Sequence, residues 1–134
     1  MPWSVATGST RTRAVSGQSM RILVSGSREL TDRMLVIRAI MNHAASPLTI
    51  IVGDCPAGAD VFARAVDAEF QVHRADWKTH GKAAGPRRNQ QMVDSGADLC
   101  LAFYREGAGN RGTKDCVRRA RISGIPVIEH TEYA

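Results

Sequence analysis

The amino-acid sequence predicts a single α/β domain, a mostly parallel sheet of about five strands with helices on both of its faces. The chain has 134 residues, which is the length of one domain. From Met20 onward, short apolar runs alternate with stretches whose apolar residues recur at three- and four-residue spacing. Because strands that alternate with helices join through right-handed crossovers, we expect a doubly wound, Rossmann-like arrangement over residues 20–134.

Each expected element has its own local signal. Residues 21–25 and 48–52 are apolar runs closed by glycine, which is typical of buried strands. Thr31 or Asp32 caps a helix over 31–45, and residues 56–60 open a second one. The remaining predictions are strands at 71–75, 98–104 and 125–128, helices at 86–95 and 112–123, and an irregular segment at 77–86. The expected apolar stripes are Met34, Ile37, Met41 with Leu30 or Ala44 on the first helix, and Phe62, Ala65, Val66, Phe70 on the second.

Composition limits the class of protein. With 43% hydrophobic and 23% charged residues, the chain is neither disordered nor collagen-like. No apolar run approaches the roughly 20 residues that span a bilayer, which excludes a membrane protein. Eighteen Lys and Arg against thirteen Asp and Glu give a net charge of +5. This excess predicts an anionic partner, either nucleic acid or a phosphorylated small molecule.

The cysteines indicate a reduced, cytoplasmic protein. Cys55, Cys100 and Cys116 form no C-x-x-C pair, and the four histidines show no ligand spacing relative to them. We therefore expect neither a metal ion nor a cofactor. Residues 1–19 hold two arginines, seven Ser or Thr residues and no acid, without the apolar core of a secretory signal. We expect this segment to be a disordered tail or a non-native extension, outside the fold.

Four loops are predicted to meet at one edge of the sheet. In open α/β sheets, ligands bind beyond the carboxyl ends of the strands. The segments 26–28, 53–60, 77–89 and 107–113 each follow a strand, and most of them are rich in glycine or carry cationic side chains. Their convergence predicts a ligand site.

The last of these loops suits phosphate. Residues 107–112 match G-x-G-x-x-G before a helix, so backbone N–H groups around Gly109 and Gly112 and the hydroxyl of Thr113 can approach an anion. Because no further βαβ unit follows, the loop predicts a phosphate cradle rather than a dinucleotide site, and a purely structural turn is the alternative. The other candidate phosphate ligands are Gly26, Ser27, Arg28, Lys82, Arg88 and Asn89.

Acidic and aromatic side chains stand beside these donors. Asp54 and Asp60 lie in the loop that also holds Gly53 and Gly58; Asp60 is expected first of all to be a helix N-cap, and hydrogen bonding to ribose hydroxyls is the functional alternative. Trp77 can stack on a base or pack against the fold.

A run of basic residues falls on the last helix. They are Arg111, Lys114, Arg118, Arg119 and Arg121, opposed there by Asp115. Nucleic acid would use them as phosphate contacts, but no known nucleic-acid motif accompanies them, and such a run is usually a solvated face. The charge distribution favours a small phosphorylated ligand.

Four motifs together resemble the small YspA-like branch of the SLOG superfamily. They are GSR (26–28), GDCPAGAD (53–60), ADW…GKAAGPRRNQQM (75–92) and GNRGT (109–113), in the family's order. The resemblance spans about residues 20–129. It implies a Rossmann-like domain that binds nucleotides or nucleotide-derived ligands and associates as a homo-oligomer, with a homodimer expected.

The same superfamily includes the Lonely Guy phosphoribohydrolases, which cleave the N-glycosidic bond of a modified nucleoside monophosphate, and the DNA-processing protein DprA. By this resemblance Arg88 matches an arginine that precedes the Lonely Guy motif P-G-G-x-G-T-x-x-E, and Gly109, Gly112 and Thr113 match its glycine–threonine part. The motif's glutamate falls on Cys116, and a thiol cannot stabilise an oxocarbenium-like transition state as a carboxylate does.

Three functions follow as hypotheses. The leading one is a nucleotide or nucleotide-derived ligand-binding domain. The second is a phosphoribohydrolase with Arg88 on the substrate and Asp115, Asp60 or Asp54 as the carboxylate, although Asp115 is expected to point about 100° away from the glutamate position on a helix. The third is DNA binding in the manner of DprA through Arg118 and Arg119.

Overall fold

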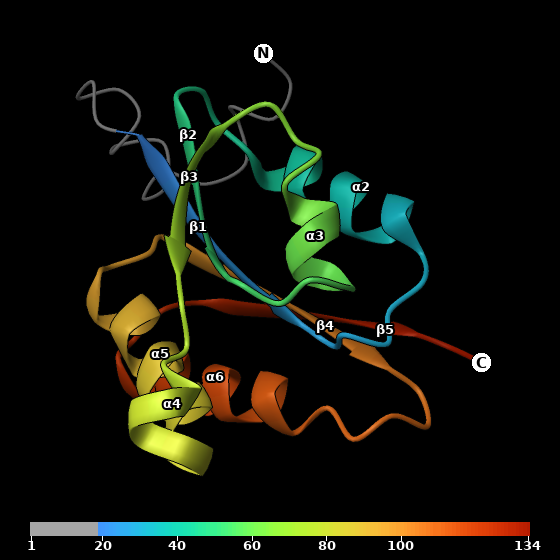
Figure 1. Ribbon diagram of the computed structural model, residues 1–134. Coiled ribbons are helices and arrows are strands. Elements are labelled where there is room, and N and C mark those ends of the chain that lie inside the picture. The colour runs from blue at the N-terminus through green and yellow to red at the C-terminus, as the bar shows by residue number, and fades with distance from the viewer. Residues whose placement is uncertain (1–18) are drawn as a thin grey trace.

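The computed structural model describes residues 19–134 and confirms the predicted fold (Figure 1). One sheet holds five parallel strands in the order β3-β2-β1-β4-β5. The strands are β1 (Met20–Gly26), β2 (Leu48–Gly53), β3 (Glu69–His73), β4 (Leu99–Arg105) and β5 (Val127–Glu132). The helices are α2 (Arg33–His43), α3 (Ala59–Ala63), α4 (Trp77–His80), the 3-10 turn η2 (Gly81–Ala83), α5 (Ala84–Asp94) and α6 (Arg111–Ile122). The expectation of a disordered or non-native tail falls, up to residue 18, outside the described residues.

Helices cover both faces of the sheet. Figure 1 shows α2 and α3 on one side and α4, α5 and α6 on the other. Side chains alternate along a strand, so neighbouring residues pack on opposite faces of the sheet. Ile22 and Val24 pack in the first layer of the core, between the sheet and helices α2 and α3, and Leu23 packs in the second layer, between the sheet and helices α5 and α6. All three are fully buried. The central strands are therefore closed on both faces, which leaves the strand ends for a site.

The buried face of α2 differs from the predicted one. Val36, Ala39 and Ile40 pack on the sheet, whereas Met34 and Met41 are 45% and 50% exposed. The sequence of α2 is apolar on two adjacent stripes, and the start of the helix decides which stripe turns inward. That start is fixed by the Asp32 side chain, which accepts the N–H of Leu35. Of the other predicted positions, Leu30 and Ala44 are buried and Ile37 packs partly against the core.

The second predicted helix is shorter than expected. α3 ends at Ala63, and Phe70, predicted on its apolar face, lies instead in the edge strand β3 with 37% of its surface exposed. Ala65 is also exposed, whereas Val66 is buried and Phe62 is partly buried. The chain must turn over residues 64–68 to reach the edge of the sheet, so β3 begins two residues before the predicted strand.

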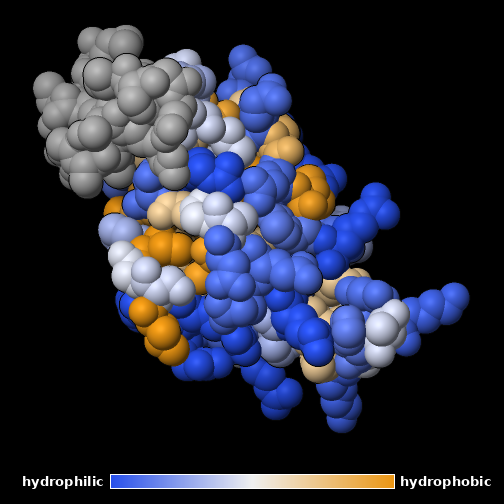
Figure 2. Space-filling view, turned by 90° about the vertical axis from the view of Figure 1, so that its left-hand side faces the viewer, coloured by the Kyte–Doolittle hydropathy of each residue, from blue (hydrophilic) through white to orange (hydrophobic). Residues whose placement is uncertain are grey.

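The face seen in Figure 2 is mostly hydrophilic, with hydrophobic side chains in separate patches.

The segment 77–86, predicted to be irregular, is largely helical. Asp76 caps α4 by accepting the N–H of Thr79 at 3.1 Å, and η2 then leads directly into α5. The other predicted elements are present with shifted ends; β5, for example, runs to Glu132. Among the described residues, no helix has the length and apolar character needed to cross a membrane.

Candidate functional site

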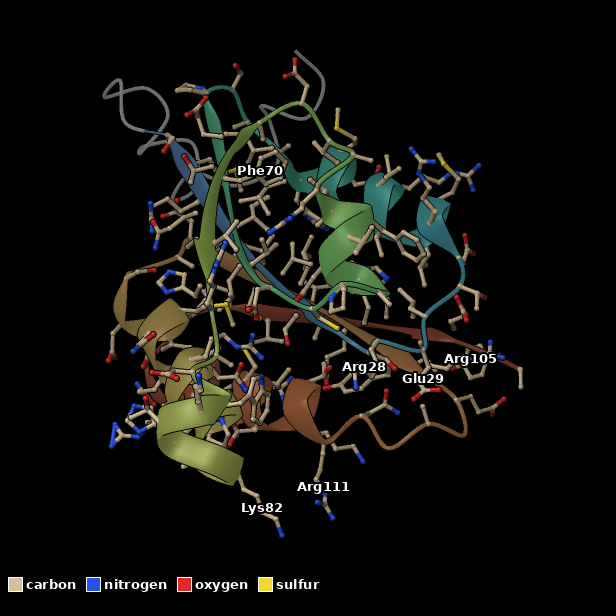
Figure 3. The ribbon with its side chains drawn as sticks, viewed as in Figure 1. Arg28, Glu29, Phe70, Lys82, Arg105 and Arg111 are labelled. Atoms are coloured by element: carbon tan, nitrogen blue, oxygen red, sulfur yellow. The ribbon has the colours of Figure 1, made fainter. Side chains whose placement is uncertain are left out.

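The four predicted loops meet at one cavity of about 500 Å³ at the carboxyl ends of the strands. The predicted residues that line it are Gly26, Ser27, Arg28, Gly53, Asp54, Asp60, Arg88, Asn89, Gly109, Gly112 and Thr113. Three predicted residues lie outside its lining. Gly58 packs beneath a neighbouring loop, Asp115 lies on α6 behind the glycine-rich loop, and Lys82 extends into solvent (Figure 3).

Glycines let the loops after β1 and β2 lie against each other. Gly58 has a φ of +76°, and a Cβ there would lie 2.2 Å from the carbonyl oxygen of Ser27. The next residue, Ala59, donates its N–H to that same oxygen at 3.3 Å. At the end of β1, a Cβ on Gly26 would lie 2.5 Å from the Cβ of Ala59. The two loops thus form one rigid wall of the cavity.

The glycine-rich loop before α6 is open toward the cavity. Asn110 holds its shape in a left-handed conformation (φ 55°), with Nδ2 donating to the carbonyls of Arg105 and Ala108 at 2.9 and 3.1 Å. A Cβ on Gly109 or Gly112 would meet no atom within 4 Å. No side chain of the described residues caps α6, so the N–H groups of its first turn are available to an anion.

Two arginines flank this loop. Arg28 and Arg111 are exposed, line the cavity and form no ion pair with any described residue. Figure 3 shows that they come from different loops, Arg28 after β1 and Arg111 from the start of α6. Their guanidinium groups are free to bind an anion bidentately.

Arg88 and two carboxylates occupy the other end of the cavity, above the end of β2. Nη1 of Arg88 lies 3.3 Å from Oδ1 of Asp54, and Nε donates to Oδ1 of Asn89 at 3.1 Å. A Cβ on Gly53 would lie 2.4 Å from Nη1 of Arg88 and 2.9 Å from Oδ2 of Asp60. The absence of a side chain at residue 53 therefore lets the arginine and the buried carboxylate share this space.

Asp60 is the buried acid of the cavity, with only 8% of its surface exposed. The N-cap interpretation is wrong: Gly58 is the N-cap of α3, and Asp60 lies in its first turn. Its Oδ2 accepts the N–H of Cys55 at 3.1 Å, and it forms no ion pair within the described part of the chain. Burial raises the pKa of Asp60 to about 6, although the Cys55 N–H and Arg88 act in the opposite direction.

Asn89 and Asp115 support the loop from behind. Asn89 is 3% exposed, and its Nδ2 donates to the carbonyl of Gly112 at 3.1 Å and to Asp115 at 3.0 Å. Asp115 also accepts from Arg118 and Arg119 at 3.1 and 2.9 Å. Burial favours its neutral form, but the hydrogen bonds from Arg119 and Asn89 prevail and hold the pKa of Asp115 below its usual value. Asp115 therefore supports the cavity wall through Asn89 without lining the cavity itself.

Cys116 is fully buried on α6, and the neighbouring Cys100 and Ser25 act to lower the pKa of its thiol. The hydrogen bond to Cys116, together with burial, raises the pKa of Cys100. These thiols belong to the core of the second layer rather than to the cavity surface. In residues 19–134, no group of three His, Cys, Asp or Glu side chains is placed to hold a metal ion.

Comparison with known proteins finds one informative similarity. No family model and no solved structure matches the chain. The Gene 61 protein of Mycobacterium phage D29 is 39% identical over 119 residues, which cover 81% of this chain and 94% of the phage protein. The chain belongs to the family of this phage protein.

The basic residues of α6 are mostly paired within the protein. Arg118 and Arg119 both bind Asp115, and Arg121 lies 3.0 Å from Glu129.

Sequence reasoning missed Asn110 as the residue that shapes the loop. Its place between two glycines was a usable signal, because asparagine tolerates the left-handed conformation better than most residues. It also missed Glu29, and it assigned Arg111 to the basic run of the last helix rather than to the cavity wall.

Proposed function

We propose that the cavity binds a nucleotide or nucleotide-derived ligand, with the phosphate at the glycine-rich loop and the first turn of α6. One observation carries this proposal: an uncapped helix start and two open glycines face a cavity that is also lined by the unpaired Arg28 and Arg111. The resemblance to the SLOG superfamily supports the same ligand class.

The arginines supply most of the expected affinity for phosphate. A hydrogen bond to a charged group contributes about 1.5–3 kcal/mol, whereas a helix dipole contributes about 0.3–1 kcal/mol. The two arginines, each able to form a bidentate pair, therefore outweigh the helix.

Thermal unfolding with a panel of nucleotides and inorganic phosphate tests the proposal. At least one ligand should raise the Tm, and Gly112→Asp should abolish the rise, because a carboxylate there repels phosphate without a steric clash. Gly112→Ala is the matched control and should keep the effect. A panel that leaves the wild-type Tm unchanged, or a Gly112→Asp protein that still responds, would remove the proposal.

A phosphoribohydrolase activity is the second candidate, favoured by the place of Asp60. Of the three carboxylates considered, Asp115 is engaged outside the cavity and Asp54 pairs with Arg88. Asp60 remains as the acid beside Arg88 that could assist cleavage of an N-glycosidic bond. Chromatography should then detect free base released from a nucleoside monophosphate, and Arg88→Ala should stop the release. Intact monophosphate after long incubation at high enzyme concentration would exclude this activity.

DNA binding is less well supported than a small ligand. The side chains it would use, Arg118 and Arg119, already pair with Asp115.

We also propose a cytoplasmic homodimer. The thiols of Cys55, Cys100 and Cys116 are all unpaired, which suits a reducing compartment, and the SLOG resemblance supports self-association.

A further inference from the structure

We infer that Asp60 binds the vicinal hydroxyls of a ribose, so that the cavity prefers ribonucleotides to deoxyribonucleotides. This inference rests on the proposed function, because it assigns the sugar end of a ligand whose phosphate lies at the glycine-rich loop.

The carboxylate of Asp60 lacks a partner on one side. Oδ2 accepts the Cys55 N–H, but Oδ1 accepts no hydrogen bond from any described residue, although the side chain is more than nine-tenths buried. Among the described residues, Nε2 of His130 is the only fully buried polar side-chain atom without a partner, so Oδ1 of Asp60 is open to the cavity and can accept a hydrogen bond there. Asp60 also lines the cavity, so a ligand is the available source of the missing donor.

The group that donates to Asp60 is neutral or cationic, not a phosphate. Asp54 lies beside it, and a second anion placed between two carboxylates would be repelled. Arg88 is the cation nearest to this end, and one of its nitrogens already binds Asp54. A sugar hydroxyl supplies a hydrogen-bond donor without adding charge.

The spacing between the two ends of the cavity fits a sugar phosphate. Asp60 lies above the end of β2, and the glycine-rich loop follows β4, with β1 between them. Two strand spacings separate these ends by about 10 Å. A ribose 5-phosphate can bridge that distance with a hydrogen bond at either end, whereas inorganic phosphate reaches one end alone.

The other carboxylates are less suited to this role. Asp54 already accepts from Arg88 and, at 3.5 Å, from the N–H of Ala75, and it is one-third exposed. Glu29 is exposed at the rim, next to Arg28 (Figure 3). Asp60 is the buried member of the three, where a hydrogen bond gained from a ligand is strongest.

Calorimetric titration at pH 7.5 tests the inference. This pH lies above the raised pKa of Asp60, so the carboxylate is ionised. The probes are the four ribonucleoside 5′-monophosphates, their 2′-deoxy and 3′-deoxy counterparts, and inorganic phosphate. We expect the best ribonucleotide to bind at least about tenfold more tightly than either deoxy form, because a carboxylate built to accept from a hydroxyl is left unpaired by the analogue.

Two variants assign the preference to Asp60. In Asp60→Ala the ribose preference should fall to about one, while affinity for the deoxynucleotides is kept or increased because a negative charge has been removed. In the matched control Asp54→Ala the preference should persist. Equal binding of ribo and deoxy forms by the wild type overturns this inference but leaves the proposed function intact, whereas no binding of any probe overturns both. A preference that survives Asp60→Ala also overturns the assignment.

Discussion

Gly58 is the residue at which a single added methyl group should do most damage to the cavity wall. Its backbone has φ 76° and ψ −143°, a region that side chains rarely adopt. A Cβ there would also lie 2.2 Å from the Ser27 carbonyl oxygen and 2.6 Å from the Cα of Arg28. Both of these atoms belong to backbone, so no side-chain rotation relieves the contact.

The size of the effect follows from two contributions. Forcing alanine into such a conformation costs about 1–3 kcal/mol. Relief of the contact requires the loops to separate, which breaks the hydrogen bond from Ala59 to Ser27 and costs about 1 kcal/mol more. We therefore expect Gly58→Ala to lose about 3 kcal/mol, or about 10 °C in Tm for a domain of this size.

Urea unfolding and calorimetry measure this loss, with Gly124→Ala as the matched control. Gly124 has a similar φ of +82° but no atom within 4 Å of a Cβ, so alanine there should cost about 1 kcal/mol. The difference between the two variants isolates the contact between the loops. If Gly58→Ala is no less stable than Gly124→Ala, that contact is not what requires glycine at residue 58.

Two further predictions concern stability and thiol reactivity. Glu132→Ala should cost about 2–3 kcal/mol at pH 7, because the carboxylate accepts from the N–H and hydroxyl of Thr31 and pairs with Arg105. Burial acts to raise the pKa of Glu132, but its hydrogen bonds hold the pKa below the usual value, so this stabilisation is present above pH 4.5 and should be lost as the pH falls. Denaturation of the wild type and of Glu132→Ala at pH 7 and pH 3 measures the difference in their stability. A difference that is the same at both pH values would contradict the assignment. Cys100 and Cys116 are fully buried, whereas Cys55 is partly exposed. Mass spectrometry after alkylation should therefore find Cys55 alone modified in the native protein and all three cysteines modified after denaturation. Rapid labelling of Cys100 or Cys116 in the native protein would show that the second layer of the core opens.

The sequence was sufficient for the fold class and for the positions of the strands because each strand carried a local signal. The runs at 21–25 and 48–52 are apolar, short and closed by glycine, and no helix of that length would satisfy the same pattern. The buried face of α2 could not be predicted in the same way. Its two adjacent apolar stripes have the same periodicity, so the sequence does not show which of them faces the sheet. The direction in which the helix leaves Asp32 decides this, and that direction depends on tertiary contacts.

The end of α3 was beyond local reasoning for a related reason. Phe70 continues the helical spacing of Phe62 and Val66. However, β2 would otherwise present a row of unpaired backbone hydrogen-bonding groups at the edge of the sheet, and residues 69–73 pair with it as a strand instead of continuing the helix. Tertiary hydrogen bonding overrides a periodicity that was real. The helices at 77–83 escaped detection because they are too short to show a period.

Convergence of the site was predictable, but the condition of its side chains was not. The rule for open α/β sheets placed Arg88 and Asp60 near each other from their positions after strands. Their sequence neighbours could not show that Asp60 is buried and forms no ion pair with any described residue, or that Asn89 of α5 binds Gly112 and Asp115 of α6. These properties arise between helices that are far apart in the chain, so they required the structure.

The charges around the cavity explain why a net charge of +5 need not mean nucleic acid. Three cations line the cavity (Arg28, Arg88, Arg111) together with three anions (Glu29, Asp54, Asp60), so its wall is balanced. A nucleic-acid backbone repeats its negative charge at every nucleotide and would place some of it against Asp54 and Asp60. A ligand with one anionic end and one neutral, hydroxyl-bearing end meets the arginines and the carboxylates separately. The order of charges in the cavity, rather than their sum, therefore favours the proposed ligand class over nucleic acid.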